Sequence, residues 1–208
     1  MPGPDSSPLL LIISAPSGGG KTTLCEQVLA SDPHTVRAIT CTTRSPRDGE
    51  RDGVDYYFLD RTAFEAHVRA GEFMEHALVH GNSYGTLRTE VLEKLRQGKN
   101  VLLSIDVQGA ETIRNKAGAD PELRRSLVTV FITPPSLAML EERLKRRGQD
   151  SAGVIRKRLS VAREEIAQWK HYDYLIISTS IAEDLRRMQA ILLAEKMRHG
   201  RAQLPICD

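Results

Sequence analysis

The feature that most constrains the fold is a glycine-rich turn between a short apolar run and a helical pattern. The apolar run spans residues 9–13 and is typical of a strand that is buried on both faces. The turn spans residues 15–22 and reads APSGGGKT. Residues 22–30 then carry leucine and valine at helical spacing. A strand, a glycine turn and a helix in this order form the context in which such a turn binds phosphate.

The turn fits the phosphate-loop pattern, with Ala15 in place of the usual first glycine. Glycines let several backbone N–H groups point at one anion, and the N-terminus of the following helix adds partial positive charge. Lys21 supplies a full charge for the β- and γ-phosphates, and the Thr22 hydroxyl can bind Mg²⁺. The pattern therefore predicts a site for a purine nucleoside triphosphate and Mg²⁺. The expected ATP-binding residues are Ala15, Pro16, Ser17, Gly18, Gly19, Gly20, Lys21, Thr22 and Thr23.

Three more apolar runs, at residues 101–105, 127–132 and 174–177, also read as buried strands, with helical patterns between them. Strands separated by helices imply a parallel sheet with helices on both faces. The predicted fold class is therefore α/β, with a parallel-sheet P-loop NTPase core. We also expect Trp169 to pack in the core, because it closes a helical stripe.

The remaining segments differ from this core in composition. Residues 35–86 contain short mixed runs that predict a small mixed α/β insertion, with one helix near residues 62–70 and Thr62–Glu65 at capping-box spacing. Ser136 is expected to cap a later helix. The expected boundaries are a flexible tail at 1–8, the core at 9–34, 87–136 and 170–208, the insertion at 35–86, and a lid with flanking helices at 137–169.

Composition excludes several classes of protein. Lysine and arginine total 29 against 27 acidic residues, which is too balanced for wholesale binding to nucleic acid or a membrane surface. No apolar run is long enough to span a membrane. Three cysteines, Cys25, Cys41 and Cys207, form no CxxC pair, so a zinc site or a disulfide framework has no support. We expect a cytoplasmic protein with reduced thiols, Cys25 being buried, and with no obligatory protein partner.

Two basic segments suit phosphate binding. Arg44 and Arg47 flank a proline, and two guanidinium groups held close together fit a dianionic phosphate, to which Tyr56 and Tyr84 can add hydroxyl donors. Taken alone, this sequence is more often a solvated basic loop. Residues 143–158 contain seven basic residues and one acid, without the aromatic side chains that RNA stacking needs.

The break at residues 148–153 in the second basic segment suits a hinged lid. Converging arginines there would stabilise the charge that develops during phosphoryl transfer. Asp106 follows a buried strand, where an acid reaches Mg²⁺ directly or through water. Asp106 can also cap the helix that follows, and both roles are compatible.

Several segments together resemble guanylate kinases. They are TTRSPRDGE at 42–50, DY at 55–56, FME at 73–75, GNSYGT at 81–86, KRRGQD at 145–150 and KRL at 157–159. With the phosphate loop, the resemblance runs in order from about residue 9 to residue 199. It implies Mg²⁺-dependent transfer of the ATP γ-phosphoryl group to GMP, an enzyme of purine nucleotide metabolism, with the insertion binding GMP.

The resemblance also implies a role for each matching residue. The GMP phosphate would be held by Arg44, Arg47, Tyr56 and Tyr84, and the guanine read by Thr40, Glu75 and Thr86. The catalytic residues would be Lys21, Arg44, Arg143, Arg147 and Arg158, and the metal ligands Thr22 and Asp106.

The Glu75 assignment also follows from chemistry. A carboxylate can accept hydrogen bonds from both N1–H and the N2 amino group of guanine, whereas adenine offers neither donor. Leaving a buried carboxylate unpaired is costly, so AMP should be rejected. The alternative is that Glu75 is an exposed surface acid beside His76.

Two positions depart from the guanylate kinase pattern. Ser104 stands where an acid is expected, and Ser178–Ser180 replaces an Asn-Asp pair near the expected adenine site. Two other functions are alternatives to this one. One is a P-loop kinase for AMP or dTMP, and the other is a non-catalytic guanylate-kinase-like module that binds phosphorylated partners. Intact Lys21 and Thr22 argue against the second.

Overall fold

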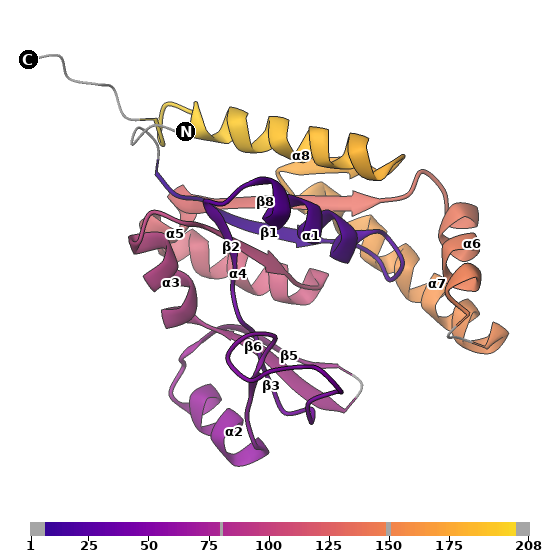
Figure 1. Cartoon of the computed structure of the whole chain (residues 1–208), viewed down its shortest axis with the longest axis horizontal. Coiled ribbons are helices and arrows are strands. Elements are labelled where there is room, and N and C mark those ends of the chain that lie inside the picture. The colour runs from indigo at the N-terminus through magenta and orange to yellow at the C-terminus, as the bar shows by residue number, and fades with distance from the viewer. Residues whose placement is uncertain (1–6, 80, 149–150, 203–208) are drawn as a thin grey trace, which may run out of the picture.

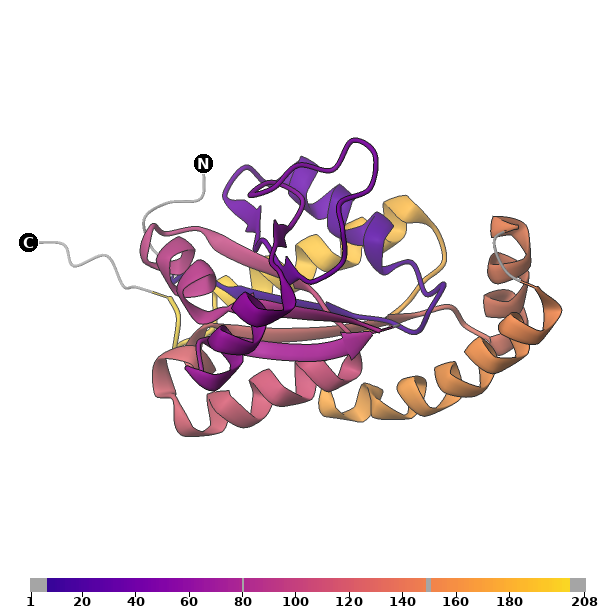
Figure 2. The same ribbon diagram turned by 90° about the horizontal axis from the view of Figure 1, so that it is seen from below.

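The computed structural model describes residues 7–79, 81–148 and 151–202. Within them, a parallel sheet carries helices on both faces, a smaller sheet lies to one side, and a helical hairpin projects from one end (Figures 1 and 2). The predicted α/β fold class is confirmed. Among the described residues, no helix is both long and apolar enough to cross a membrane.

The central sheet has five parallel strands in the order β2-β7-β1-β8-β9. Strand β1 lies in the middle, where Leu10 pairs with Val101 on one side and Leu127 on the other. Burial on both faces explains the uninterrupted apolar run of β1. The bounds are β1 Leu10–Ser14, β2 Thr35–Arg37, β7 Asn100–Ser104, β8 Leu127–Thr133 and β9 Tyr174–Ile177.

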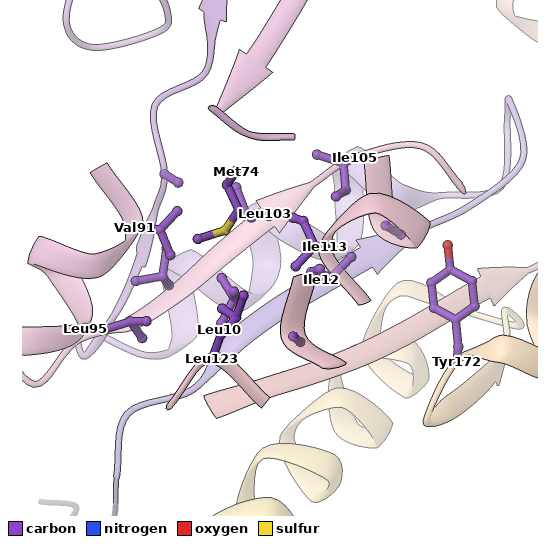
Figure 3. Close-up of a cluster of buried hydrophobic side chains, with 14 of the residues drawn as sticks. Leu10, Ile12, Met74, Val91, Leu95, Leu103, Ile105, Ile113, Leu123 and Tyr172 are labelled. Atoms are coloured by element: carbon purple, nitrogen blue, oxygen red, sulfur yellow. The ribbon is translucent and has the colours of Figure 1, made fainter. Parts of the chain in front are cut away.

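Alternate residues of β1 belong to two different hydrophobic cores. Leu10 and Ile12 pack with Val91 and Ile113 from the helices on one face, as Figure 3 shows. Leu11 and Ile13 pack instead under the helices of the other face. The first face carries α3 (Arg88–Arg96), α4 (Val107–Ala119) and α5 (Pro121–Ser126), and the second carries α1 (Lys21–Ser31) and α8 (Ile181–Lys196).

The smaller sheet has four strands in the order β4-β3-β6-β5, with helix α2 packed on it. Its bounds are β3 Cys41–Thr42, β4 Tyr57–Phe58, β5 Phe73–Val79, β6 Asn82–Leu87 and α2 Arg61–Arg69. Strand β5 joins the two parts, because Phe73 packs with Phe64 of α2 while the next residue, Met74, packs in the main core.

Two sequence-based expectations about this region need correction. The insertion begins after β2 rather than at residue 35, because Thr35–Arg37 pairs with β7 in the central sheet. A strand of three residues carries too little periodicity to be seen in the sequence. Helix α2 is capped by Asp60, which accepts a hydrogen bond from the Ala63 amide at 2.7 Å, and not by Thr62.

The projecting hairpin consists of α6 (Leu137–Arg147) and α7 (Ala152–Ala167). Ser136 caps α6 as predicted, accepting from the Met139 amide at 3.2 Å. Gly148 ends α6 with a φ of 65°, a left-handed conformation that glycine adopts without strain. The predicted break at residues 148–153 falls where α6 ends, but Ala152 and Gly153 already belong to α7, and residues 149–150 lie outside the described residues.

Two residues differ from expectation at the ends of these elements. Trp169 is 47% exposed, because after Ala167 the chain tightens into the 3₁₀ helix η1 (Gln168–His171), and this change of period rotates the side chain out of the stripe. The loose tail expected over residues 1–8 does not extend to Ser7, whose amide donates to the Arg201 carbonyl at 3.1 Å. Residues 1–6 and Cys207 lie outside the described residues.

Candidate active site

The phosphate loop joins β1 to α1 in a conformation that requires its glycines. Gly18 and Gly20 have φ values of 87° and 102°, which side chains strongly disfavour. A Cβ on Gly19 would lie 2.9 Å from both the Ala15 Cβ and the Pro16 carbonyl oxygen. Gly20 is also the N-cap of α1, so the free amides of this helix begin at the loop. The sequence of the loop therefore fits the geometry of an anion site.

Lys21 is the first residue of α1 and reaches across to the end of β7. Its Nζ donates to the Ile105 carbonyl at 3.2 Å, beside Asp106. Burial lowers the pKa of Lys21, and the nearby Asp106 and Glu165 carboxylates oppose that shift. Asp106 caps α4, accepting from the Gly109 amide through Oδ1 at 2.8 Å, so its predicted capping role is confirmed.

A cavity of about 340 Å³ lies on one side of the phosphate loop, and we call it the donor cavity. Its lining includes four residues predicted to bind ATP or act on it, namely Gly18, Gly20, Thr23 and Arg143. The other lining residues are Leu24, Arg146, Ser178, Thr179, Ser180, Ile181 and Asp184. The Ser178–Ser180 run, near which the adenine is expected from the sequence, lines the donor cavity.

The projecting hairpin contacts the loop directly. Leu140 and Leu144 of α6, both fully buried, pack closely against Gly18. A Cβ added to Gly18 would lie only 3.2 Å from a side-chain carbon of each leucine. From α7, Arg158 Nη1 donates to the Ser17 hydroxyl at 3.3 Å. Arg147 is the last residue of α6, and its side chain lies outside the described part of the structure. Two of the three predicted lid arginines are therefore brought to the loop or to the donor cavity beside it.

A second cavity, of about 230 Å³, lies on the other side of Lys21, and we call it the acceptor cavity. Predicted site residues that are far apart in the sequence line it together, namely Lys21, Thr40, Tyr56, Glu75, Tyr84 and Asp106. Arg37, Ala77, Val79, Ser104 and Ile105 complete the lining. The Thr22 side chain lines an adjoining cavity that shares Arg37, Tyr56 and Ser104 with this one.

Glu75 is buried in the acceptor cavity wall, with only 4% of its surface exposed, so it is not a surface acid. A bulge in β5 between Phe73 and Glu75 brings Glu75 opposite Thr86. The Thr86 hydroxyl donates to Glu75 Oε1 at 2.8 Å. Burial raises the pKa of Glu75 to about 7, against which the Thr86 hydrogen bond acts. Gly109 packs closely against Glu75 on its other side. A Cβ added to Gly109 would lie only 3.0 Å from Glu75 Oε2, so a larger residue would crowd the carboxylate.

Three residues predicted to hold the GMP phosphate form a cluster of donors, and two of them, Tyr56 and Tyr84, share the acceptor cavity with Glu75. The Arg44 guanidinium lies 5.5 Å from the Tyr56 ring, and the Tyr56 and Tyr84 ring centroids are 6.2 Å apart. Arg44 Nη2 donates to both carboxylate oxygens of Glu50, at 2.8 and 2.9 Å. The structure does not bring the predicted Arg47 side chain into this cluster, because that side chain is exposed and does not line the acceptor cavity; only the Arg47 backbone amide is engaged, donating to Glu50 at 2.8 Å.

The sequence alone does not identify three residues of the candidate site, one in the arginine loop and one in each cavity. Glu50 orders the arginine loop, and Arg44 holds the pKa of Glu50 below its usual range. Arg37 lines the acceptor cavity with its guanidinium 6.0 Å from the Tyr56 ring, and a lone arginine in a short strand gives no sequence signal. Asp184 lines the donor cavity from helix α8, where it looks like an ordinary first-turn acid.

A parallel sheet with a phosphate loop after its central strand, together with a smaller sheet at one side, is the fold of the P-loop nucleoside monophosphate kinases. The family model described as "Guanylate kinase" matches residues 7–195. The chain therefore belongs to the guanylate kinase family.

Individual relatives agree with this assignment. The chain is 43% identical to the guanylate kinase of Maricaulis maris (strain MCS10), covering 93% of this chain and 86% of the relative. It is 44% identical to that of Paramagnetospirillum magneticum (strain ATCC 700264 / AMB-1), covering 93% and 87%. The crystal structure of guanylate kinase from Anaplasma phagocytophilum matches with a TM-score of 0.73 and 36% identity, covering 95% of this chain and 90% of that chain.

Proposed function

We propose that the protein transfers the γ-phosphoryl group of ATP to GMP, giving ADP and GDP, with Mg²⁺ as cofactor. One observation carries the proposal. Gly18 and Gly20 line the donor cavity, and Lys21, the next residue, lines the acceptor cavity. A single loop therefore borders both cavities, so two nucleotides bound in them would present their phosphates to the same lysine.

The acceptor cavity suits GMP. Tyr56 and Tyr84 line it and offer hydroxyl donors to a phosphate, and we assign the Arg44 guanidinium, 5.5 Å from the Tyr56 ring, to the same phosphate. Glu75, held by Thr86, offers the two acceptor oxygens that guanine N1–H and N2–H require. We assign the Thr40 side chain to the same base, because it lines the same cavity.

The transfer itself needs alignment and charge neutralisation more than proton movement. An oxygen of the GMP phosphate attacks the γ-phosphorus, and the bond from that phosphorus to the β-γ bridging oxygen breaks, so ADP leaves with the electron pair. The attacking oxygen is already anionic, so no general base is required. We assign Lys21, Arg44, Arg143, Arg147 and Arg158 to neutralising the phosphates while the α6–α7 hairpin excludes water.

The residues present fit Mg²⁺, which favours hard oxygen ligands and binds proteins through few of them. Asp106 Oδ1 is used by the Gly109 amide, which leaves Oδ2 for a metal or its water shell. Thr22, at the start of α1, is an exposed residue, so its hydroxyl is a candidate ligand. When bound, Mg²⁺ would neutralise charge on the β- and γ-phosphate oxygens. The cytoplasmic location expected from the sequence stays a prediction.

Product analysis tests the proposed function, and metal removal tests the cofactor. With ATP, GMP and Mg²⁺, we expect ADP and GDP to form in equal amounts, measured by chromatography of the quenched reaction. Excess EDTA should reduce the rate to background, and added Mg²⁺ should restore it, because the phosphate charge is then neutralised again. ADP formed without GDP, or GMP binding without turnover, would contradict phosphoryl transfer to GMP. An undiminished rate in EDTA would contradict the metal.

The pKa of Glu75 predicts a pH dependence of GMP use. Glu75 must be ionised to accept both guanine hydrogen bonds, and its pKa in the free protein is raised to about 7. At saturating ATP, kcat/KM for GMP should therefore rise with pH up to about pH 7 and fall by about tenfold per unit below it. The matched variant Glu75→Gln should lose this step and keep only the substrate phosphate titration near pH ~6. Identical profiles for the two proteins would refute the assignment.

A further inference from the structure

The donor cavity contains a buried carboxylate for which the proposed transfer has no role. Asp184, on the first turns of α8, is only 7% exposed. Its Oδ2 accepts from the Ser178 hydroxyl at 2.7 Å, and its Oδ1 accepts from the Thr179 amide at 3.2 Å. The residues that follow β9, Ser178–Ser180, carry no carboxylate, so the carboxylate in the lining of the donor cavity comes from helix α8.

The surroundings of Asp184 hold its side chain in place and supply a donor to each of its carboxylate oxygens. A buried carboxylate is costly unless donors satisfy it, and here each oxygen has one donor. The N-terminus of α8, capped by Ser180, adds partial positive charge to the same turn. The Ser178 hydroxyl proton is therefore directed towards Asp184.

Because the Ser178 hydroxyl donates to Asp184, its oxygen remains available as a hydrogen-bond acceptor. A hydroxyl that donates its proton to Asp184 keeps its lone pairs for an incoming donor. Arg143 Nη2, from α6, is such a donor and lies 3.3 Å from Ser178 Oγ. Because a guanidinium can only donate, the hydrogen bonds run in one direction, from Arg143 to Ser178 and from Ser178 to Asp184.

The chain of hydrogen bonds holds Arg143 beside the phosphate loop. A Cβ placed on Gly20 would lie 3.7 Å from Arg143 Nη1 and 3.9 Å from Ser178 Oγ. The same helix packs Leu140 and Leu144 against Gly18. The apolar contacts fix where α6 sits on the loop, and the hydrogen-bonded chain fixes where its guanidinium points.

We propose that Asp184 and Ser178 are positioning residues that hold Arg143 at the Gly20 end of the phosphate loop for the donor triphosphate. The inference rests on the proposed function, because it takes Arg143 to bind the donor. Neither residue needs to touch ATP, since both act through the guanidinium. Their loss should impair the use of ATP and leave GMP binding at the acceptor cavity unchanged.

The test is a double-mutant cycle of Ser178→Ala and Asp184→Ala, with Glu183→Ala as the matched control. Glu183 is the adjacent acid on α8, but it pairs with Arg186 and Arg187. We expect each single variant to lower kcat/KM for ATP by about tenfold, which corresponds to one hydrogen bond to a charged group. The KM for GMP should stay within about twofold of the starting value, and the control should resemble the unmodified protein.

The double variant provides the decisive comparison. If both residues act through one hydrogen-bonded chain, the double variant should lose no more than the worse single variant. Losses that multiply to about a hundredfold would overturn the proposal, since independent effects add in free energy. Normal ATP use by Ser178→Ala, or an equal rise in the KM for GMP, would also overturn it. If Asp184→Ala does not fold, Asp184→Asn replaces it, because its amide turns a donor towards Ser178 while its oxygen still accepts from Thr179.

A binding measurement separates this inference from the proposed function. The affinity of each variant for ATP, measured by calorimetry without GMP, should fall in the same order as kcat/KM for ATP. If the unmodified protein binds ATP but does not phosphorylate GMP, the proposed function fails. The positioning role is then judged by whether Ser178→Ala and Asp184→Ala weaken ATP binding, and unchanged affinities would refute it.

Discussion

Replacing Lys21 with alanine should lower the rate of phosphoryl transfer by about a thousandfold or more while leaving the protein folded. Lys21 is the residue of the phosphate loop that lines the acceptor cavity, so its charge would contact the group in transit. The fold should tolerate the change, because alanine is the best helix former and the lost contact is one hydrogen bond to the Ile105 carbonyl. Steady-state kcat and a thermal unfolding curve check both parts.

The matched control for this variant is Lys99→Ala. The Lys99 ammonium also donates to a backbone carbonyl, that of Pro33 at 3.5 Å, but it is exposed and distant in sequence from the loop. We expect Lys99→Ala to keep the starting rate. An unaltered rate for Lys21→Ala, or an equal loss in both variants, would refute the role of Lys21 in transfer.

Replacing Glu75 with alanine should lower kcat/KM for GMP by about a thousandfold, because two hydrogen bonds from guanine to a buried carboxylate are lost. The KM for ATP should change little, since Glu75 lines the acceptor cavity and not the donor cavity. The fold should survive, because burial raises the pKa of Glu75 and its ionised form is therefore unfavourable in the ligand-free protein. Initial rates with each nucleotide varied in turn give both constants.

The companion variant Glu75→Gln keeps the shape of the side chain and an oxygen for the Thr86 hydroxyl. It presents an amide N–H₂ group where the guanine needs an acceptor, so it should be impaired almost as strongly as Glu75→Ala. Similar losses for GMP and ATP in either variant would show that the position is structural and would undo the guanine assignment.

Much of the fold could be predicted because its signals are local. The apolar runs of β1, β7 and β8 reflect burial on both faces, and they mark the parallel sheet directly. Strand β2 was missed because its three residues pair with β7 from a distance in sequence. Trp169 was misplaced because the change from α to 3₁₀ geometry at Ala167 alters the period on which its stripe was counted.

The candidate site also has residues that the sequence predicts and contacts that it does not. The glycines and Lys21 can be predicted because the loop is continuous in sequence, and the resemblance supplies Glu75, Tyr56 and Tyr84. The bulge that turns Glu75 towards Thr86 could not be predicted, because it depends on the register of two paired strands. The link from Arg143 through Ser178 to Asp184 joins α6, the end of β9 and α8, so no local pattern contains it.

The most direct test of the account compares GMP, AMP and dTMP as acceptors in one coupled assay with ATP and Mg²⁺. The account predicts rapid turnover with GMP, and kcat/KM values for AMP and dTMP lower by about a thousandfold or more, because neither base satisfies the buried Glu75 carboxylate. Comparable turnover with AMP or dTMP, or none with GMP, would contradict it.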